Sequence, residues 1–415
     1  MIVALLTLAF LLAATVLALG GPRRVAWRVE TRLVQPTAAP APAASRSERW
    51  LQDLDYLERN LVRLHADAFH STPRRAFEAE FAAARARVET ASDAALLLEV
   101  MRLVSLVGDG HTATWSFLDA FAPLALRIEP IGGVWSVTAT GPEHTELLAG
   151  ELLAIGAHGV AELAERWAPY VAADSEADRQ RRVAHLLVLP EALHASGLVD
   201  EPDRVAVTVR RADGGVVTAI LARADAGTEL VRADAALLPN REPQRAHWVL
   251  PLDGRDAVYL RYRSARNRDA FAAVAQEALA LLDRAPQARL VVDLRGNGGG
   301  DSSVIRPLLE GLRERSAGGR VAALIDAGTY SSATMNARDL DELGAVLVGE
   351  PTGDALGGWG EVRTFALPNS GIRVGVSSYF HGGGGAQVVP DVSVVPDVRA
   401  WLEGVDPVLE AALRR

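Results

Sequence analysis

The stretch "DLRGNGGGDSSVIRPLLEGL", residues 293–312, decides the fold of the last third of this chain. The apolar run "LVVDL" at 290–294 predicts a strand. A glycine-rich loop follows it, and then a helical pattern. Glycine allows sharp bends and leaves amide N–H groups accessible to an oxygen anion. The segment therefore predicts a backbone cradle for either a phosphate or the oxyanion of an acyl transfer.

The same order of strand, loop and helix recurs along this third of the chain. The strands "AVYLRY" (257–262) and "VAALID" (321–326) each precede a helical pattern, and "AVLVGE" (345–350) follows the second helix. Repeated units of this kind predict an α/β fold with a largely parallel sheet. Loops at the carboxyl ends of the strands then carry the site, and two such loops face one another here.

The glycine loop fits acyl transfer better than phosphate binding. As a dinucleotide fingerprint "RGNGGGD" fails, because Asp301 stands where the helix-packing glycine is needed. A Walker loop needs a lysine, and all 43 basic residues of this chain are arginine. An oxyanion hole needs only one or two N–H groups aimed at a developing charge. A nucleotide-binding α/β protein stays as an alternative that rests on the glycines alone.

A serine pair follows the next strand. Ser331 and Ser332, in "GTYSSATMN", lie between a strand end and a helix start. One interpretation is a helix N-cap; the other is a nucleophile that projects above the sheet, where the helix N-terminus favours negative charge. Since the chain has no lysine, the base is a histidine or a carboxylate of raised pKa. His111, in "LVGDGHTATW", is the first candidate, and His381, in "YFHGGGG", is the second.

Composition limits the class of protein. The chain has 415 residues, of which 49% are hydrophobic and 23% charged, enough for a large core and more than one domain. A net charge of -9 leaves no basic field for nucleic acid. The absence of cysteine excludes disulfides, thiolate catalysis and cysteine-based zinc sites.

The chain divides into segments of different texture. Residues 2–20 are apolar throughout, long enough to span a bilayer, and are followed by arginines that place the body on the cytoplasmic side, in conflict with export. Farther on, the pattern changes from helical stripes to short β-type runs that loosely resemble PDZ-like modules. We predict a membrane anchor or signal segment (1–21), a Pro/Ala linker (22–46), a helical domain (47–115), a β-rich PDZ-like region (116–232) and an α/β core (233–405).

Several segments, in order, resemble the tail-specific, or C-terminal processing, serine peptidases, in the tricorn-like branch that pairs serine with histidine. They are "GDGHT", "LVVDLRGNGGGDS", "TYSSA", "VGEPTG" and "LPNSG", and the resemblance covers about residues 47–400. It implies a crotonase-like ββα spiral with a helical N-terminal domain and a PDZ-like insert. It also implies peptide or protein substrates, with neither a cofactor nor a metal.

The resemblance assigns roles residue by residue. Ser331 matches the nucleophile and His111 matches the histidine base. Gly299 matches the oxyanion glycine, and the amide of Ser332 would be the second donor. The implied activity is that of a serine endopeptidase, membrane-anchored or exported to the cell envelope.

One departure from the family pattern concerns the residue that orients His111. The tricorn-like branch has a glutamate shortly before "VVPD" (388–391), and here "HGGGGAQ" precedes that segment with no carboxylate. Glu350 and Glu361 are candidates for this role, although each is also explained as a residue that caps or solvates a strand end. The missing glutamate supports an alternative function, a catalytically inactive peptide- or lipid-binding relative of the same fold.

Overall fold

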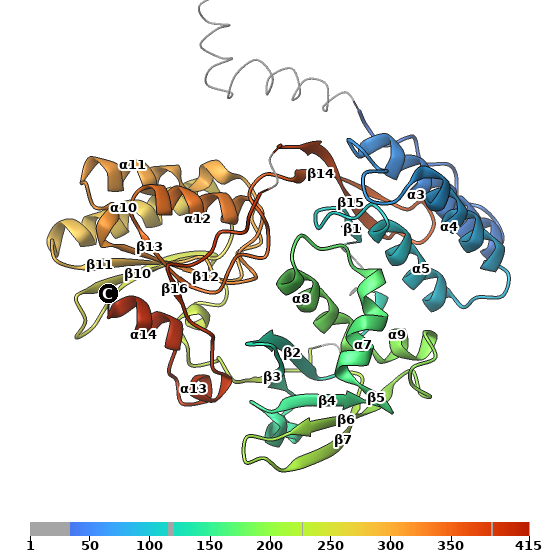
Figure 1. Cartoon of the computed structure of the whole chain (residues 1–415), viewed down its shortest axis with the longest axis horizontal. Helices are drawn as coiled ribbons and strands as arrows, with labels where there is room; N and C mark the ends of the chain where they lie inside the picture. The colour runs from blue at the N-terminus through green and yellow to red at the C-terminus, as the bar shows by residue number, and fades with distance from the viewer. Residues whose placement is uncertain (1–33, 115–119, 226, 383–384, 415) are drawn as a thin grey trace, which may run out of the picture.

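The computed structural model describes residues 34–114, 120–225, 227–382 and 385–414. Within these residues no helix combines the length and the apolar character needed to cross a bilayer. The predicted anchor or signal segment at 1–21 lies outside the described residues. The domain boundaries stay predictions, and the elements are described below as the structure has them (Figure 1).

Three helices form a layer at the amino-terminal end. They are α3 (Arg46–Leu64), α4 (Arg74–Arg87) and α5 (Asp93–Ser105). A capping box fixes the start of α3, since the Ser45 hydroxyl accepts from the backbone of Glu48 while the Glu48 carboxylate accepts from the Ser45 N–H. The apolar stripes of the three helices face one another in a common core.

A small antiparallel sheet joins this helical layer to the end of the chain. Its order is β1 (Ala113–Thr114), β15 (Arg373–Phe380) and β14 (Trp359–Ala366). Val374 and Val376 of β15 are fully buried against the helices (Figure 1). The β14–β15 hairpin, which lies within the predicted α/β core (233–405), packs on the amino-terminal helices. Because β15 pairs with β1, which directly follows the histidine turn, this hairpin connects that turn to the last third of the chain.

The middle of the chain is an antiparallel sheet covered by short helices. Its main path runs β2-β3-β4-β6-β7, with β5 and β8 pairing at its sides. The strands are β2 (Leu126–Ile131), β3 (Val134–Thr140), β4 (Glu151–Ile155), β5 (His158–Gly159), β6 (Arg204–Arg210), β7 (Val216–Ala222) and β8 (Val231–Arg232). The helices are α7 (Val160–Trp167), α8 (Glu176–Leu187) and α9 (Pro190–Ala195). The region is β-rich, as predicted, and α8 carries a polar end toward the site.

The last third contains the predicted parallel sheet, in the order β16-β13-β12-β11-β10-β9, with only β9 antiparallel. Helices α10, α11 and α12 pack on one face and α14 on the other (Figure 1). The strands are β9 (His247–Leu252), β10 (Ala257–Tyr262), β11 (Arg289–Asp293), β12 (Val321–Ile325), β13 (Val346–Gly349) and β16 (Val392–Ser393). The helices are α10 (Arg268–Arg284), α11 (Arg306–Glu314), α12 (Ser332–Glu342), α13 (Val398–Leu402) and α14 (Pro407–Leu413).

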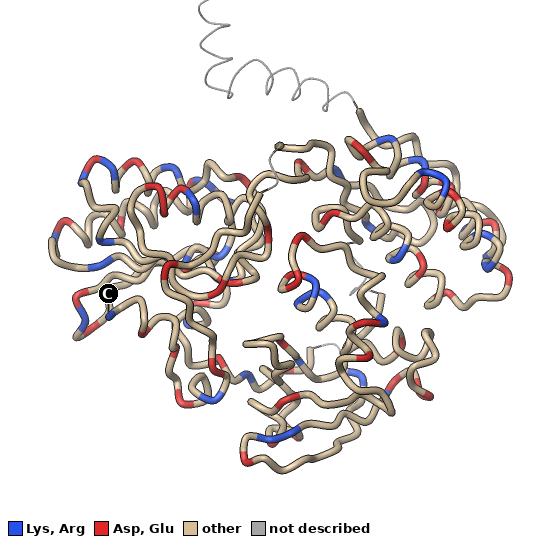
Figure 2. Tube along the Cα trace, in the orientation of Figure 1, with Lys and Arg blue, Asp and Glu red and all other residues tan. Residues whose placement is uncertain are grey.

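A buried ion network anchors the glycine loop to the end of β11. Arg295 bonds Asp293 at 2.7 Å and Asp406 at 2.7 Å, and Arg261 bonds Asp293 at 3.1 Å. The two arginines outweigh the effect of burial and hold the pKa of Asp293 well below its usual range. Since the network fixes the backbone where the glycines begin, the loop starts from a rigid base. Elsewhere arginines and acidic residues are interspersed along the trace (Figure 2).

Candidate active site

The glycine loop and the serine turn meet at the carboxyl edge of the parallel sheet. Gly299 has a φ of 92°, and a Cβ atom there would lie 2.8 Å from both the Ser331 Cβ and the Tyr330 carbonyl oxygen. Only glycine accommodates both the backbone angle and the contact. Two other parts of the chain approach this loop closely: the turn that carries the predicted nucleophile lies against Gly299, and the Ala265 carbonyl oxygen lies against Gly300.

Ser331 occupies a strained turn before α12. Its φ of 55° and ψ of −127° are unusual for a residue with a side chain. Its hydroxyl makes no capping hydrogen bond, so the N-cap interpretation does not account for this serine. Among the described residues, Ser331 is bonded only through its backbone: its N–H donates to Asp354 Oδ2 at 2.9 Å, and its carbonyl accepts from α12. The turn has the character of a nucleophile elbow.

The predicted oxyanion donors differ in their bonding. The Gly299 N–H donates to Asn297 Oδ1 at 3.0 Å, and the Asn297 amide is held in turn by the Tyr262 carbonyl at 2.8 Å. The Ser332 nitrogen, at the first position of α12, lies 2.9 Å from the place that a Gly299 Cβ would take. The Ser332 nitrogen therefore lies at the junction of the two loops, at the amino-terminal end of α12, whereas the Gly299 N–H is already hydrogen-bonded to Asn297.

Asp109 builds the turn that presents His111. Its Oδ1 accepts from the His111 N–H at 3.0 Å, the Thr112 N–H at 2.9 Å and the Ser377 hydroxyl at 2.6 Å, and its Oδ2 lies 3.1 Å from His65 Nε2. Burial opposes ionisation, but these bonds outweigh it and lower the pKa of Asp109 to about 2. The predicted turn thus exists, and it holds the His111 backbone firmly.

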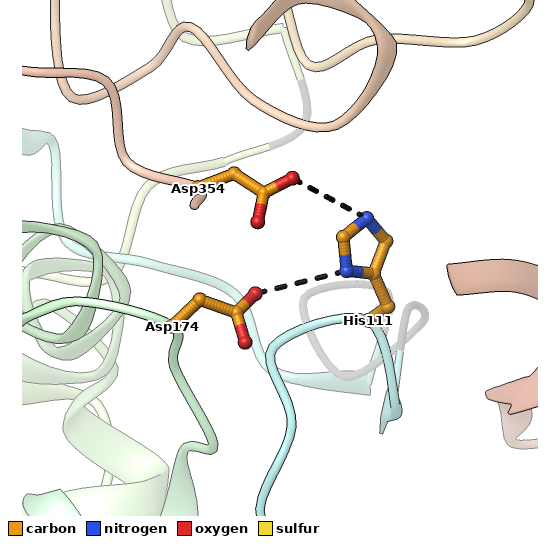
Figure 3. A group of neighbouring side chains, drawn as sticks. All are labelled: His111, Asp174 and Asp354. Carbon is orange, nitrogen blue, oxygen red and sulfur yellow. Dashed lines mark ion pairs between the residues drawn. The ribbon is translucent and has the colours of Figure 1, made fainter. Parts of the chain in front are cut away.

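The imidazole of His111 lies between two carboxylates (Figure 3). Nδ1 is 3.7 Å from Asp174 Oδ2, and Nε2 is 3.9 Å from Asp354 Oδ2. The ring also packs on Tyr330, with 4.9 Å between the ring centroids. Burial lowers the pKa of His111, and the nearby carboxylates, Asp174 foremost, oppose this only in part. The lowered pKa favours the neutral imidazole, which is the form that can accept a proton.

Each of the two carboxylates is held by neighbours of its own. Asp174, in the loop before α8, accepts from the Gly110 N–H at 3.0 Å and from the Tyr330 hydroxyl. Asp354, in the loop after β13, accepts from the Ser331 N–H. Burial and then the charge of Asp174 raise the pKa of Asp354 to about 8. The two carboxylates thus lie close enough that the negative charge of Asp174 disfavours ionisation of Asp354.

The structure brings most of the predicted residues together and leaves the two glutamates apart. Asp354 touches both the Ser331 turn and His111, which links them. Glu361 lies 4.0 Å from the His381 ring instead, and burial with the charge of Asp326 raises the pKa of Glu350 to about 7. Among the described residues, the groups beside the His111 ring are Asp174, Asp354 and Tyr330, so the orienting role of the glutamates stays a prediction without a supporting contact.

Sequence reasoning missed the two aspartates. Asp354 directly follows the "VGEPTG" segment that we had singled out, so its proximity to that motif was a usable signal. Asp174 lies in "VAADSEAD", which has no motif or periodicity that marks chemistry. Only the packing of the middle region on the histidine turn brings this carboxylate to the ring.

Comparison with known proteins supports the fold. No family model matches the chain, and neither does any curated protein. Mature CPAF is similar at 14% identity over 89% of this chain and 96% of that chain, with a TM-score of 0.58. CPAF complexed with lactacystin gives a TM-score of 0.60 at 14% identity, covering 89% and 97% of the two chains.

A further similar structure is the photosystem II D1 C-terminal processing protease, at 15% identity over 90% of this chain and 97% of that chain, with a TM-score of 0.41. CPAF and this protease are both S41 peptidases. The present chain therefore shares the mixed α/β fold of CPAF along most of its length.

Proposed function

We propose that this chain is a serine endopeptidase of the tail-specific protease type, which hydrolyses peptide bonds through an acyl-enzyme on Ser331. The observation that carries the proposal is the Ser331 turn, where a strained backbone leaves the hydroxyl without a hydrogen bond among the described residues, and where Asp354 contacts both the Ser331 N–H and the His111 ring. The hydroxyl of an N-cap serine would accept a hydrogen bond from a backbone N–H of the helix. A buried structural histidine would have both ring nitrogens hydrogen-bonded. The fold shared with CPAF agrees with this function.

In the proposed mechanism His111 is the base and Asp174 is its orienting residue. A carboxylate beside Nδ1 favours the tautomer with the proton on that nitrogen, which leaves Nε2 free to accept the Ser331 proton. The present separation of 3.7 Å between Nδ1 and Asp174 is looser than a hydrogen bond, as is common in an empty active site. In this proposal Asp174, rather than Glu350 or Glu361, is the residue that orients His111.

The oxyanion would form beside the two loops. Attack of the Ser331 oxygen on the peptide carbonyl makes an alkoxide, which the Ser332 N–H at the start of α12 is placed to stabilise. Gly299 would contribute its amide only after that N–H leaves Asn297. His111 then returns its proton to the leaving amine, and water releases the acyl group from Ser331.

A small cavity next to the histidine turn suggests where a substrate side chain binds. Its volume is about 80 Å³, and its floor and walls are largely apolar, with Met101, Val104 and Tyr170 among them. Thr112 and Ala113, which directly follow His111, form another wall. We infer that a short apolar side chain of the peptide enters here.

Labelling by a serine-directed phosphonate tests the proposal. The full chain is expected to be labelled once, and Ser331→Ala is expected to lose the label while keeping its melting temperature. Ser196→Ala is the matched control, because Ser196 lies at the end of α9 and its hydroxyl only donates to the Ala192 carbonyl. Equal labelling of the Ser331→Ala variant would remove the assignment.

The alternative function is a peptide-binding relative without turnover. Two observations favour it: the Gly299 amide is already bonded to Asn297, and Ser331 is tied to Asp354 through its N–H. Such a protein would bind peptides unchanged by His111→Ala and would not cleave them. Fluorescence-polarisation binding measured beside a cleavage assay on the same peptide separates the two functions.

We also propose, from the apolar run at residues 2–20, that the peptidase is held at a membrane or exported to the cell envelope. Fractionation of cells that express the full chain, with carbonate washing of the membranes, tests this. Recovery of the full chain in the soluble fraction, without processing, would contradict it.

A further inference from the structure

Three side chains around the catalytic histidine form a set with the composition of a metal site. His111, Asp174 and Asp354 each offer one ligand atom, and these atoms all lie within 4.8 Å of one another (Figure 3). The residues come from the histidine turn, the loop before α8 and the loop after β13, so the set exists only because three parts of the fold meet. An imidazole nitrogen with two carboxylate oxygens is a common ligand set for zinc, with water in the fourth position.

The histidine points an unsatisfied nitrogen into this set. His111 Nδ1 is fully buried and has no hydrogen-bond partner among the described residues, and the side chain as a whole is 10% exposed. A buried ring nitrogen without a partner costs free energy, since it has given up water and gained nothing in exchange. The nearest acceptor or ligand group is Asp174 Oδ2, at 3.7 Å, which is too far for a hydrogen bond.

Both carboxylates are held by donors that leave them on the site. The Gly110 N–H and the Tyr330 hydroxyl fix Asp174, and the Ser331 N–H fixes Asp354. A Cβ at position 110 would displace the Tyr330 hydroxyl and the Asp174 carboxylate from where they now lie, so glycine there permits this arrangement. Outer hydrogen bonds of this kind orient ligands in metal sites.

The charge of the surroundings also favours a cation. Asp174, Asp354 and Asp178 lie near one another, and the buried Arg182 is the positive group among them. Arg182 bonds Asp178 at 2.7 Å and stacks over the Tyr330 ring at 5.4 Å, so it already has its partners. The charge of Arg182 also acts on Asp174, but the hydrogen-bond donors to Asp174 and Asp354 described above are neutral N–H and hydroxyl groups.

From these observations we propose that His111, Asp174 and Asp354 bind a divalent transition-metal ion, Zn²⁺ by preference, and that the ion switches the peptidase off. Zinc bonds of about 2.0–2.2 Å in a tetrahedral site place neighbouring ligand atoms roughly 3.3–3.6 Å apart. The observed spread of ligand atoms needs only small side-chain movements to reach that geometry. Ca²⁺ and Mg²⁺ fit less well, because they select six or more oxygen ligands.

The inhibitory half of the inference rests on the proposed function. A metal ion on the imidazole occupies the lone pair, or removes the carboxylate that fixes the tautomer, so His111 no longer accepts the Ser331 proton. Binding itself does not depend on catalysis. The two halves therefore fail separately.

Titration calorimetry of Zn²⁺ into the metal-free full chain tests the binding. We expect one ion per chain, with affinity kept in Ser331→Ala and reduced at least about tenfold in Asp174→Asn and in His111→Ala. The matched control is His158→Ala, since His158 forms an exposed pair with Glu162 at 3.1 Å that mimics the composition of the site without its third ligand. Melting curves show whether each variant is folded, and Asp354→Asn supplies a second test if His111→Ala is not.

The visible spectrum of bound Co²⁺ gives an independent reading, since the intensity of its absorption bands reports low coordination numbers. Stoichiometric Zn²⁺ binding that is unchanged in His111→Ala and in both aspartate variants would overturn the site. A chain that binds Zn²⁺ as expected but never reacts with the phosphonate would keep the metal site and reject the peptidase. An active chain whose phosphonate labelling is unaffected by saturating Zn²⁺ would overturn the regulatory half.

Discussion

Asp109 and His111 lie in the same short turn, and each belongs to a different histidine–carboxylate group. The two groups differ in how they are hydrogen-bonded. In the first, His65 and Asp109 are fully buried, lie 3.1 Å apart and have further partners around them. In the second, His111 faces Asp174 and Asp354 at 3.7 and 3.9 Å, and its Nδ1 has no hydrogen bond among the described residues. Asp109 and His111 are two positions apart in the sequence.

The difference is the one expected between a structural polar cluster and the proposed functional one. Bonds from its neighbours lower the pKa of Asp109 to about 2, whereas burial and a like charge raise the pKa of Asp354 to about 8. A closed network stabilises the fold because each group gains a partner. An open one keeps its groups reactive, and perturbed groups of this kind gather at functional sites.

The largest expected effect is on chemistry at the open group. His111→Ala should slow phosphonate labelling of Ser331 by at least about 10³-fold, because His111 is the proposed base for Ser331. Its melting temperature should change by no more than a few degrees, since the ring is not part of a closed network. Labelling kinetics and thermal melting check the two parts of this prediction. If His111→Ala were labelled at the wild-type rate, the proposed contrast in function between the two histidine–carboxylate groups would be wrong.

At the closed group the effect should fall on stability. Asp109→Asn is expected to lower the free energy of unfolding by about 3–5 kcal/mol, because it leaves the buried donors of Thr112, Ser377 and the His111 backbone with a weaker acceptor. Urea denaturation followed by circular dichroism measures the loss. The stability that Asp109 contributes is present above its usual pKa of 3.8 and is lost as the pH falls toward 2.

The sequence predicted the parts of this comparison that local patterns encode. The glycine loop, the serine turn and the "GDGHT" turn are each set by residues within a few positions of one another. The parallel sheet followed from the repeated strand–loop–helix order, and the structure contains it. These features needed no knowledge of distant contacts.

The partners of His111 could not be predicted in the same way. Asp174 reaches the turn across 64 positions of sequence, measured from its bond to Gly110, and Ser377 reaches Asp109 across 268. Such contacts depend on how the middle region and the β14–β15 hairpin pack, which no local periodicity records. We looked for a glutamate near "VVPD", and the carboxylates that the fold supplies come from elsewhere.

Asp354 is expected to have a smaller effect on the free energy of unfolding than Asp109, with the opposite dependence on pH. Its pKa is about 8 in the folded chain against a usual value of 3.8, so between these pH values the folded chain keeps a proton that the unfolded chain releases. The contribution of this group to stability therefore declines as the pH rises from about 4 to 8. In buffer with a chelator, Asp354→Asn should gain about 1–3 kcal/mol relative to the wild type between pH 5 and pH 8. An unchanged difference between the two chains across this range would show that Asp354 titrates normally.

The smallest effect is expected at a third histidine–carboxylate pair, which lies on the surface. His158 Nδ1 is 3.1 Å from Glu162 Oε1, as close as His65 is to Asp109, but Glu162 is exposed and also bonds Arg166. Water solvates these groups when the pair is broken, so His158→Ala should shift the melting temperature by no more than about 2 °C. Labelling of Ser331 should be unchanged. If this variant destabilised the chain as much as Asp109→Asn does, short distance alone would explain the stability of such pairs, and burial with multiple partners would no longer distinguish the closed group from the open one.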